Sequence, residues 1–219
     1  MTRLFLCLGA LVALVSCNSN SPNAKEQRIA DMKRATDFHS YSKPSEAVTT
    51  HLSWEARVDF ETRQIHATAT YDMKLADDAA RILLDARDLD IQQVTVDGAT
   101  VDFELGPSRP FLGQPLSIPV LPSSEKVSVT YSTSPDAAAF LWVEGESPFL
   151  FTQSQAILAR TWVPCQDSPG IRFTYDAKVS VPKELMALMS AVNPTEKSVD
   201  GNYRFEMNQP IPSYLLALA

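Results

Sequence analysis

Apolar and polar residues alternate with a period of two along much of the chain, beginning at residue 51. The segment Gln64–Leu75 shows this most clearly, because every second residue from Ile65 onward is apolar and those between are polar or charged. Side chains of a β-strand point alternately to opposite faces of a sheet, whereas a helix repeats every 3.6 residues. The alternation therefore predicts strands with one buried and one solvated face.

Other segments extend the pattern and complete a mostly β chain. The further predicted strands are Leu52–Phe60, Arg81–Asp85, Ile91–Val96, Thr100–Leu105, Lys126–Tyr131, Ile171–Val181, Leu185–Ala191, Tyr203–Met207 and Tyr214–Ala219. Turns are predicted at Glu61-Thr62 and Asp97-Gly98. No linker interrupts these segments, so we expect one domain over residues 40–219, built of packed mixed or antiparallel sheets.

The first residues differ from the rest in composition. Arg3 precedes an apolar run, Leu4–Val15, which is shorter than the roughly 20 residues that span a bilayer as a helix. The run ends in Leu-Val-Ser-Cys, which resembles the bacterial lipobox, in which the cysteine is acylated and becomes the new N-terminus. We therefore expect a signal peptide over residues 1–16, a lipid on Cys17 and a polar tether over residues 17–39. An ordinary secretory signal that contains a cysteine is the alternative.

This N-terminal pattern predicts a location and a partner. A lipid on Cys17 would anchor the protein to a membrane of the bacterial cell envelope, and Asn18 after the cysteine favours the outer membrane, facing the periplasm. The net charge of −7 and the absence of clustered Lys and Arg argue against nucleic acid as a partner. Removal of Cys7 with the signal would leave Cys165 as the one thiol besides the acylated cysteine, and we expect it to be buried and unreactive, since no cation lies near it in sequence.

The sequence contains none of the common catalytic motifs. There is no HExxH helix, Cys-x-x-Cys pair, nucleophile elbow or P-loop, and the three histidines, His39, His51 and His66, are not spaced as zinc ligands. From these residues alone we predict neither a catalytic residue nor a metal site in the chain.

The segment Phe149–Tyr175 is unusual because many polar residues lie among aromatic and aliphatic ones. Burying an amide or guanidinium without a partner costs about 1–3 kcal/mol, so these groups are either paired internally or available to a ligand. Both a fully paired polar turn at a sheet edge and half of a binding site agree with the composition.

The same segment carries a family resemblance. FLFTQSQAILARTWVPCQDSPGIRFTY, the following AKVSVPKEL and ALMSA, and QPIPSYLLAL near the end closely resemble zinc aminopeptidases of the leukotriene hydrolase type, in the M1 (gluzincin) family. The resemblance extends from about Phe38 to Ala219. It implies a saddle-like N-terminal β-domain that packs against a separate thermolysin-like catalytic domain.

The resemblance also implies a function and site residues. The family's Gln-Ala element falls on Gln155 and Ala156, with Ser154 just before it, and faces the zinc cleft where it holds the amino end of a peptide substrate. The pattern from Arg160 to Pro169 is implied to be structural, with a possible ion pair between Arg160 and Asp167. The family's zinc helix, exopeptidase loop and catalytic tyrosine would lie beyond Ala219, so zinc is expected only in the full-length enzyme.

We therefore expect the substrate-cleft domain of an exported zinc aminopeptidase, inactive by itself, with peptides and its own catalytic domain as partners. The apolar segment Tyr214–Ala219 has no polar closing residues, so we also expect the full-length protein to continue beyond it. The alternative is a non-catalytic lipoprotein β-domain that binds peptides or a partner protein.

Overall fold

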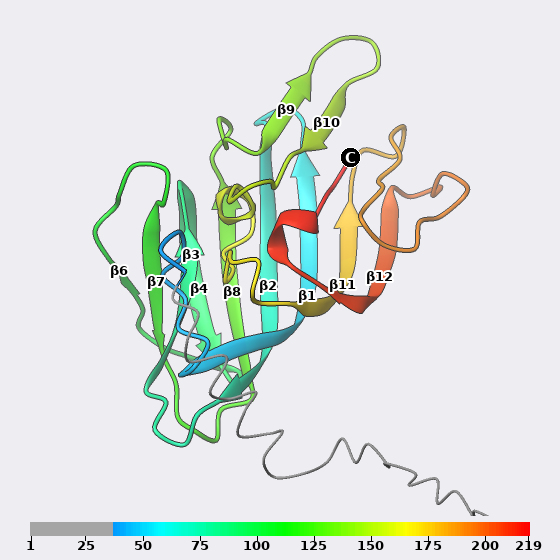
Figure 1. Ribbon diagram of the computed structural model, residues 1–219. Helices are drawn as coiled ribbons and strands as arrows, with labels where there is room; N and C mark the ends of the chain where they lie inside the picture. The colour runs from blue at the N-terminus through cyan, green and yellow to red at the C-terminus, as the bar shows by residue number, and fades with distance from the viewer. Residues whose placement is uncertain (1–36) are drawn as a thin grey trace, which may run out of the picture.

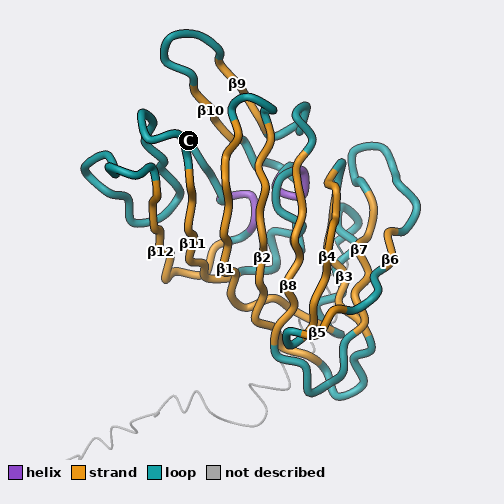
Figure 2. The backbone as a smooth tube through the Cα atoms, turned by 180° about the vertical axis from the view of Figure 1, so that it is seen from behind, coloured by secondary structure: helices purple, strands orange, loops and turns teal. Residues whose placement is uncertain are grey.

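The computed structural model describes residues 37–219, and its largest element is a mixed sheet of seven strands (Figures 1 and 2). In order across the sheet, the strands are β12 (Asn202–Ile211), β11 (Phe173–Ser180), β1 (Ala47–Asp59), β2 (Gln64–Leu75), β8 (Lys126–Thr133), β4 (Leu89–Val96) and β5 (Ala99–Thr100). Neighbouring strands run antiparallel except β1 and β11, which are parallel. The predicted mostly β fold of mixed and antiparallel sheets is confirmed.

Two smaller sheets accompany the large one. The first is antiparallel, in the order β3 (Arg81–Ala86), β7 (Gln114–Pro119) and β6 (Glu104–Leu105). The second is the hairpin of β9 (Phe140–Val143) and β10 (Phe149–Thr152), which projects beyond the end of the large sheet in Figure 1. Two short 3₁₀ helices, η1 (Ala159–Thr161) and η2 (Ser213–Leu215), complete the elements of the described part, and no helix there is long and apolar enough to cross a membrane.

The strand alternation produces a one-sided core. In β1 and β2 the buried residues are those on the apolar phase, among them Leu52, Trp54, Ile65 and Tyr71, all at most 1% exposed. The loop from residue 153 to 172 covers this inner face of the large sheet, and its Trp162 meets Trp54 edge to face with ring centroids 5.3 Å apart. The opposite, outer face of the sheet is polar.

The predicted strand boundaries need three corrections. Leu185–Ala191 is not a strand of a sheet: its pairing is limited to an antiparallel bridge of Met189 to Leu218, flanked by backbone hydrogen bonds of Leu188 and Ser190 to the chain end, and the side chain of Asn193 binds both backbone groups of Met189. Tyr214–Ala219 begins within η2, and only its last three residues make backbone hydrogen bonds to other parts of the chain, at Thr152, Leu188 and Ser190. Thr100–Leu105 is divided between β5 and β6, which belong to different sheets.

A buried charge cluster joins the loop to the rest of the domain. The side chain of Arg160 is 0% exposed, and its Nε donates to Oδ2 of Asp167 at 2.9 Å, which confirms the predicted ion pair. The other nitrogens of the guanidinium donate to the backbone oxygens of Leu112 (2.9 Å), His39 (2.7 Å) and Asp167 (3.1 Å). Burying a guanidinium costs free energy because the charge loses its water. The cost is tolerable only when the N–H donors find other partners, as they do here.

Asp85 is the second carboxylate of the cluster, and the sequence analysis did not identify it. It is fully buried at the end of β3, 3.7 Å from Nη1 of Arg160, and it accepts hydrogen bonds from the Ser40 hydroxyl, the Tyr41 N–H and the Asp167 N–H at 2.6–2.9 Å. Burial raises the pKa of Asp85 above 3.8, against the lowering effect of Arg160 and of these donors. A raised pKa means that the folded state holds this proton more readily than the unfolded chain. The contribution of Asp85 to stability is therefore full below pH 3.8 and is lost as pH rises through its folded pKa.

Tyr131 offers a test of the packing under the loop. Its hydroxyl accepts from Trp54 Nε1 and donates to the Trp162 carbonyl, both at 2.9 Å and all within the core. Tyr131→Phe leaves two buried groups without a partner, so we expect a loss of about 1–3 kcal/mol in the free energy of unfolding, measured by urea denaturation. Tyr41→Phe is the matched control: the Gly113 carbonyl that it frees still receives the Arg109 N–H at 2.7 Å, so the loss should be smaller. Equal losses for the two variants would contradict the assignment.

Arg160 offers a test of the charge cluster. Arg160→Met leaves two buried carboxylates without their cation, and we expect a loss of about 3–5 kcal/mol in unfolding free energy at pH 7. Lys43→Met removes an exposed ion pair with Glu46 (3.2 Å) and should cost at most about 1 kcal/mol.

The pH dependence of the stability lost in Arg160→Met shows whether that loss is electrostatic. Without the guanidinium the pKa of Asp85 rises further, so the folded variant takes up a proton as pH falls and regains stability. The deficit relative to the wild type should therefore shrink between pH 7 and about pH 4.5. A deficit that stays constant or grows on acidification would show that the lost energy is packing and not charge.

Candidate functional site

The turn that follows β10 carries the three residues that the sequence analysis singled out. Ser154 lies at its base and is 2% exposed; its hydroxyl donates to the Leu216 carbonyl (2.7 Å) and accepts from Trp162 Nε1 (3.0 Å). Next to it, Thr152 exchanges hydrogen bonds with Leu218 through its backbone N–H (3.0 Å) and its hydroxyl (2.8 Å). The start of the turn is thus tied both to the core and to the last described residues of the chain.

Gln155 and Ala156 follow on the exposed part of the turn, joined by a cis peptide bond. The N–H of Gln155 donates to the side-chain oxygen of Gln153 at 3.1 Å. The carboxamide of Gln155 itself forms no hydrogen bond to any described residue. A free carboxamide offers one acceptor oxygen and two N–H donors without adding a charge.

Gln155 and Ala156 line a cavity of about 830 Å³ whose walls are mainly apolar. The apolar wall comes from five parts of the chain: the N-terminal lead-in, β1, the turn itself, the loop after η1, and η2. Its residues are Pro44, Val48, Ile157, Pro169, Ile171 and Tyr214. Charged groups at this cavity are Arg172 and Asp37. Burial acts to raise the pKa of Asp37, but hydrogen bonds from Ser168 and His39 prevail and hold it below 3.8, so this carboxylate is ionised at neutral pH.

Other polar residues of the Phe149–Tyr175 segment are paired internally. The carboxamide of Gln166 is buried and binds the backbone of β1, donating to the Ala47 carbonyl and accepting from the Thr49 N–H, both at 2.9 Å. Cys165 is 1% exposed, as predicted, and burial raises the pKa of its thiol well above 9.0. The segment therefore combines a paired polar interior with two exposed side chains at this cavity, Gln155 and Arg172, that form no hydrogen bond to a described residue.

The described residues do not fit a zinc ion. No group of three His, Cys, Asp or Glu side chains within residues 37–219 is placed to hold a metal. His51 is hydrogen-bonded to Thr174 (2.7 Å) and Asp176 (2.8 Å), and His66 is hydrogen-bonded to Ser132 (2.9 Å), both on the outer face of the large sheet. The cysteine predicted to carry a lipid, Cys17, lies outside the described residues.

Sequence reasoning found the turn, Ser154 and the pair of Arg160 and Asp167, but missed Asp85, Pro44 and Val48. Asp85 could have been noticed, because it ends a strand whose preceding residues, Leu83 and Leu84, are apolar, and a carboxylate in that position requires a partner. Pro44 and Val48 gave no such signal, since nothing local in the sequence links them to a turn more than a hundred residues away.

Comparison with known proteins identifies the family. The sequence profile of the Peptidase M1 N-terminal domain matches residues 48–215. The leukotriene A-4 hydrolase of Xenopus laevis is 42% identical over 200 residues, covering 83% of this chain and 33% of that protein. Leucine aminopeptidase 2 of Candida albicans is 32% identical over 171 residues, covering 77% of this chain and 27% of that protein. The chain thus spans about a third of the length of these relatives.

Solved structures agree with the sequence comparison. Yeast LTA4 hydrolase in complex with bestatin superposes with a TM-score of 0.77 at 28% identity, covering 90% of this chain and 32% of that one. The M1 zinc metallopeptidase of Deinococcus radiodurans bound to a Tyr-Ser-Ala substrate has the same fold, with a TM-score of 0.63 at 17% identity over 81% of this chain and 43% of that one. The chain belongs to the M1 peptidase family, of which it contains the N-terminal domain.

Proposed function

We propose that this domain forms one wall of the substrate cleft of an exported zinc aminopeptidase that removes N-terminal residues from peptides. The observation that carries the proposal is the unpaired carboxamide of Gln155 on the rim of the apolar cavity. Relatives that share the domain are named as aminopeptidases and hydrolases, and a structural neighbour is described with a peptide substrate bound.

The three turn residues have separate roles in this proposal. The side-chain oxygen of Gln155 accepts a hydrogen bond from the α-ammonium group of the peptide, and the small side chain of Ala156 leaves room for the substrate backbone. Ser154 is a predicted site residue whose hydroxyl is already engaged with Leu216 and Trp162, so we assign it to positioning the turn. The cavity carries both Asp37 and Arg172, and in this proposal the cationic amino end lies on the side of the ionised Asp37 carboxylate.

Zinc and the catalytic groups belong to other parts of the enzyme in this proposal. The described residues do not supply a ligand set, so no catalytic step is assigned to them. What the domain contributes is orientation of the substrate relative to the reacting groups, which lowers the entropic cost of reaction. The catalytic domain of the same enzyme is the partner that would close the cavity from its open side.

A lipid anchor on Cys17 would place the enzyme at the bacterial cell envelope, with the outer membrane favoured by Asn18. We expect cells fed a clickable fatty-acid analogue to label the wild-type protein and not Cys17→Ala. Cys7→Ala is the control, since this cysteine lies inside the proposed signal peptide and its removal should leave labelling unchanged. Labelling of Cys17→Ala at the wild-type level would refute the anchor while leaving the family assignment untouched.

Gln155 provides the test of the cleft. In the full-length gene product, Gln155→Ala should lower kcat/KM for aminoacyl anilides by about 10- to 150-fold, because a hydrogen bond to a charged group contributes roughly 1.5–3 kcal/mol. Gln209→Ala, at an exposed position of β12, is the matched control and should leave kcat/KM within about twofold.

Two results would contradict the proposal. Unchanged kcat/KM in Gln155→Ala would exclude this side chain from the substrate site. Failure of the full-length protein to hydrolyse any aminoacyl anilide would instead favour a non-catalytic lipoprotein domain that binds peptides or a partner protein.

A further inference from the structure

The hairpin of β9 and β10 is apolar on both of its faces. The strands read Phe-Leu-Trp-Val and Phe-Leu-Phe-Thr, so apolar residues follow one another without the polar alternation of β2. Because neighbouring side chains of a strand point to opposite faces, a continuous apolar run is typical of a strand that is covered on both sides. The described residues cover only one side of this hairpin.

The covered face packs on the end of the large sheet. Leu150 and Thr152 are buried there. The ring of Trp142, on the same face, meets the rings of Phe60 and Phe140 edge to face, with centroids 5.2 and 5.7 Å apart. These contacts hold the hairpin in place relative to the sheet, so its other face also has a defined position.

Four exposed apolar side chains form this other face, which we call the hairpin face. Strand register pairs Val143 with Phe149 and Leu141 with Phe151, so the four side chains lie together as two cross-strand pairs. They are between 40% and 57% exposed, on a hairpin that projects beyond the large sheet (Figure 1). A contiguous exposed apolar patch of this kind marks a surface that is covered by a partner.

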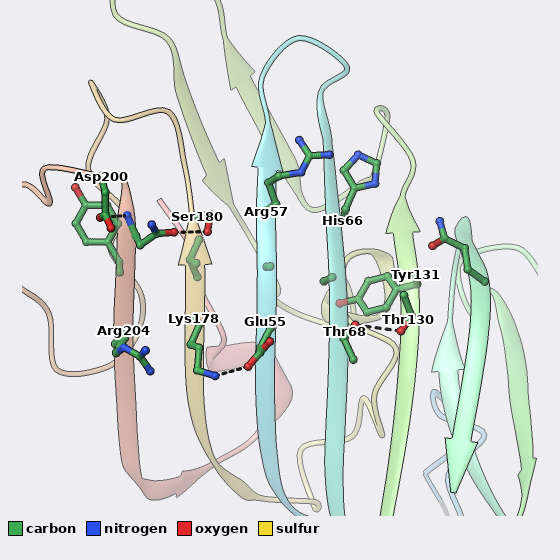
Figure 3. A pocket seen from close by; sticks show the side chains of 16 residues that line it. Glu55, Arg57, His66, Thr68, Thr130, Tyr131, Lys178, Ser180, Asp200 and Arg204 are labelled. Atoms are coloured by element: carbon green, nitrogen blue, oxygen red, sulfur yellow. Dashed lines mark hydrogen bonds and ion pairs between the residues drawn. The ribbon is translucent and has the colours of Figure 1, made fainter. Parts of the chain in front are cut away.

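The outer face of the large sheet differs in kind. Figure 3 shows its polar side chains bonded to one another, with Lys178 paired to Glu55 and Thr68 hydrogen-bonded to Thr130 at 3.0 Å. Polar groups of this kind are well solvated without a partner. The need for a cover is therefore specific to the hairpin face.

The last described residues lie at the base of the hairpin. Leu218 binds Thr152, and Ala219 lines the same mainly apolar depression of about 190 Å³ as Phe149. The matched relatives are about three times as long as the part that this chain covers, which is 33% of one and 27% of another. Residues that follow Ala219 in a full-length product would therefore start beside the hairpin face, at a high effective concentration for it.

The hairpin face also leads to the turn that carries Gln155. The Gln153 N–H donates to the Ala139 carbonyl at 2.7 Å, which extends the hairpin pairing by one residue. Gln153 is exposed on the same phase of the alternation as Phe149 and Phe151, and its side-chain oxygen accepts from the Gln155 N–H at 3.1 Å. A body that covers the hairpin face would thus lie next to the proposed substrate contact.

We propose that the hairpin face is the surface on which the catalytic domain of the same chain docks, and that docking there aligns its catalytic groups with Gln155. The inference rests on the proposed function, which supplies this domain as the partner. The side chains of the hairpin face offer apolar area and no charge, so the matching surface is apolar as well.

Hydroxyl-radical footprinting of the full-length gene product tests the docking without a substitution in the domain. The Cys17→Ala form is used in detergent-free buffer, so that neither lipid nor detergent covers the hairpin face. Leu141 is 57% exposed and Leu105, on β6, is 40% exposed, so an uncovered Leu141 would be oxidised at least as fast as Leu105. We expect oxidation of Leu141 to be at least about fivefold slower, as measured by mass spectrometry. Equal or faster oxidation of Leu141 would overturn the proposal.

A double variant tests the same contact from the other direction. Phe149→Glu/Phe151→Glu would place two carboxylates where docking buries them, so Leu141 should become oxidised at least as fast as Leu105. Phe111→Glu/Leu121→Glu, at two exposed apolar positions outside the hairpin, is the matched control and should leave Leu141 oxidation within about twofold. Equal effects of the two double variants would contradict docking at the hairpin. The footprint of the unsubstituted domain decides the question if a variant fails to fold, which far-UV circular dichroism reports.

Two further results would assign the cover to another partner and overturn the proposal. Loss of Leu141 protection on dilution would indicate a second copy of the chain, and loss on deletion of residues 18–36 would indicate the N-terminal segment. The footprint does not depend on turnover. An inactive protein with protected Leu141 would therefore reject the aminopeptidase but not the docking, and a Gln155-dependent enzyme with unprotected Leu141 would reject only the docking.

Discussion

The buried guanidinium of Arg160 is the group on which the arrangement of this domain depends. It comes from the loop over the sheet, yet its partners belong to the lead-in at His39, the end of β3 at Asp85, the loop at Leu112 and the same loop at Asp167. Removing this one cation would leave several acceptors without their partner at once. The contributions of such a cluster to stability are therefore coupled and cannot be assigned pair by pair. The cluster thus fixes where the loop can lie, and the loop in turn fixes the turn at Gln155.

The loop of residues 153–172 is a polar segment that packs against the apolar inner face of the large sheet. It must bury apolar side chains and still give its buried polar groups hydrogen-bond partners. Trp162 and Cys165 are placed in the core beside Trp54 and Tyr71, while the backbone oxygens that this placement would bury are given donors, as Tyr131 gives to Trp162. Ser154 serves the same purpose for Leu216. The Leu158 N–H also donates to the Ser154 carbonyl at 2.9 Å, so the backbone is held on both sides of Gln155 and Ala156 while the Gln155 side chain stays unpaired.

The sequence predicted those parts of the fold whose cause is local. Strands β1, β2, β8 and β11 bury one face each, and that burial is visible as alternation without knowledge of the partner strands. Strand β7 was not predicted. It contains Pro115 and Pro119, which lie outside the short stretch that pairs with β6, so their missing N–H groups are tolerated there. Tyr214–Ala219 was predicted as a strand from its apolar residues, but it begins within η2 and only its last three residues pair, through a short bridge to residues 188–190.

For the candidate site, too, the sequence predicted the residues that are close together in the chain and not the contacts between distant segments. The Gln-Ala element could be found from a continuous motif, and the ion pair between Arg160 and Asp167 from a spacing of seven residues. The rest of the cluster and the cavity wall combine positions from residue 37 to residue 214, and no periodicity encodes such contacts. An unpaired polar side chain is informative in this setting because its neighbours are paired so completely. The side chains of Arg160, Asp167, Gln166, Ser154 and Tyr175 all find internal partners in this segment, whereas the exposed side chains of Gln155 and Arg172 form no hydrogen bond to a described residue. In the proposed cleft a ligand would supply hydrogen bonds to the amide of Gln155, and the surrounding apolar wall would make those bonds stronger by excluding water.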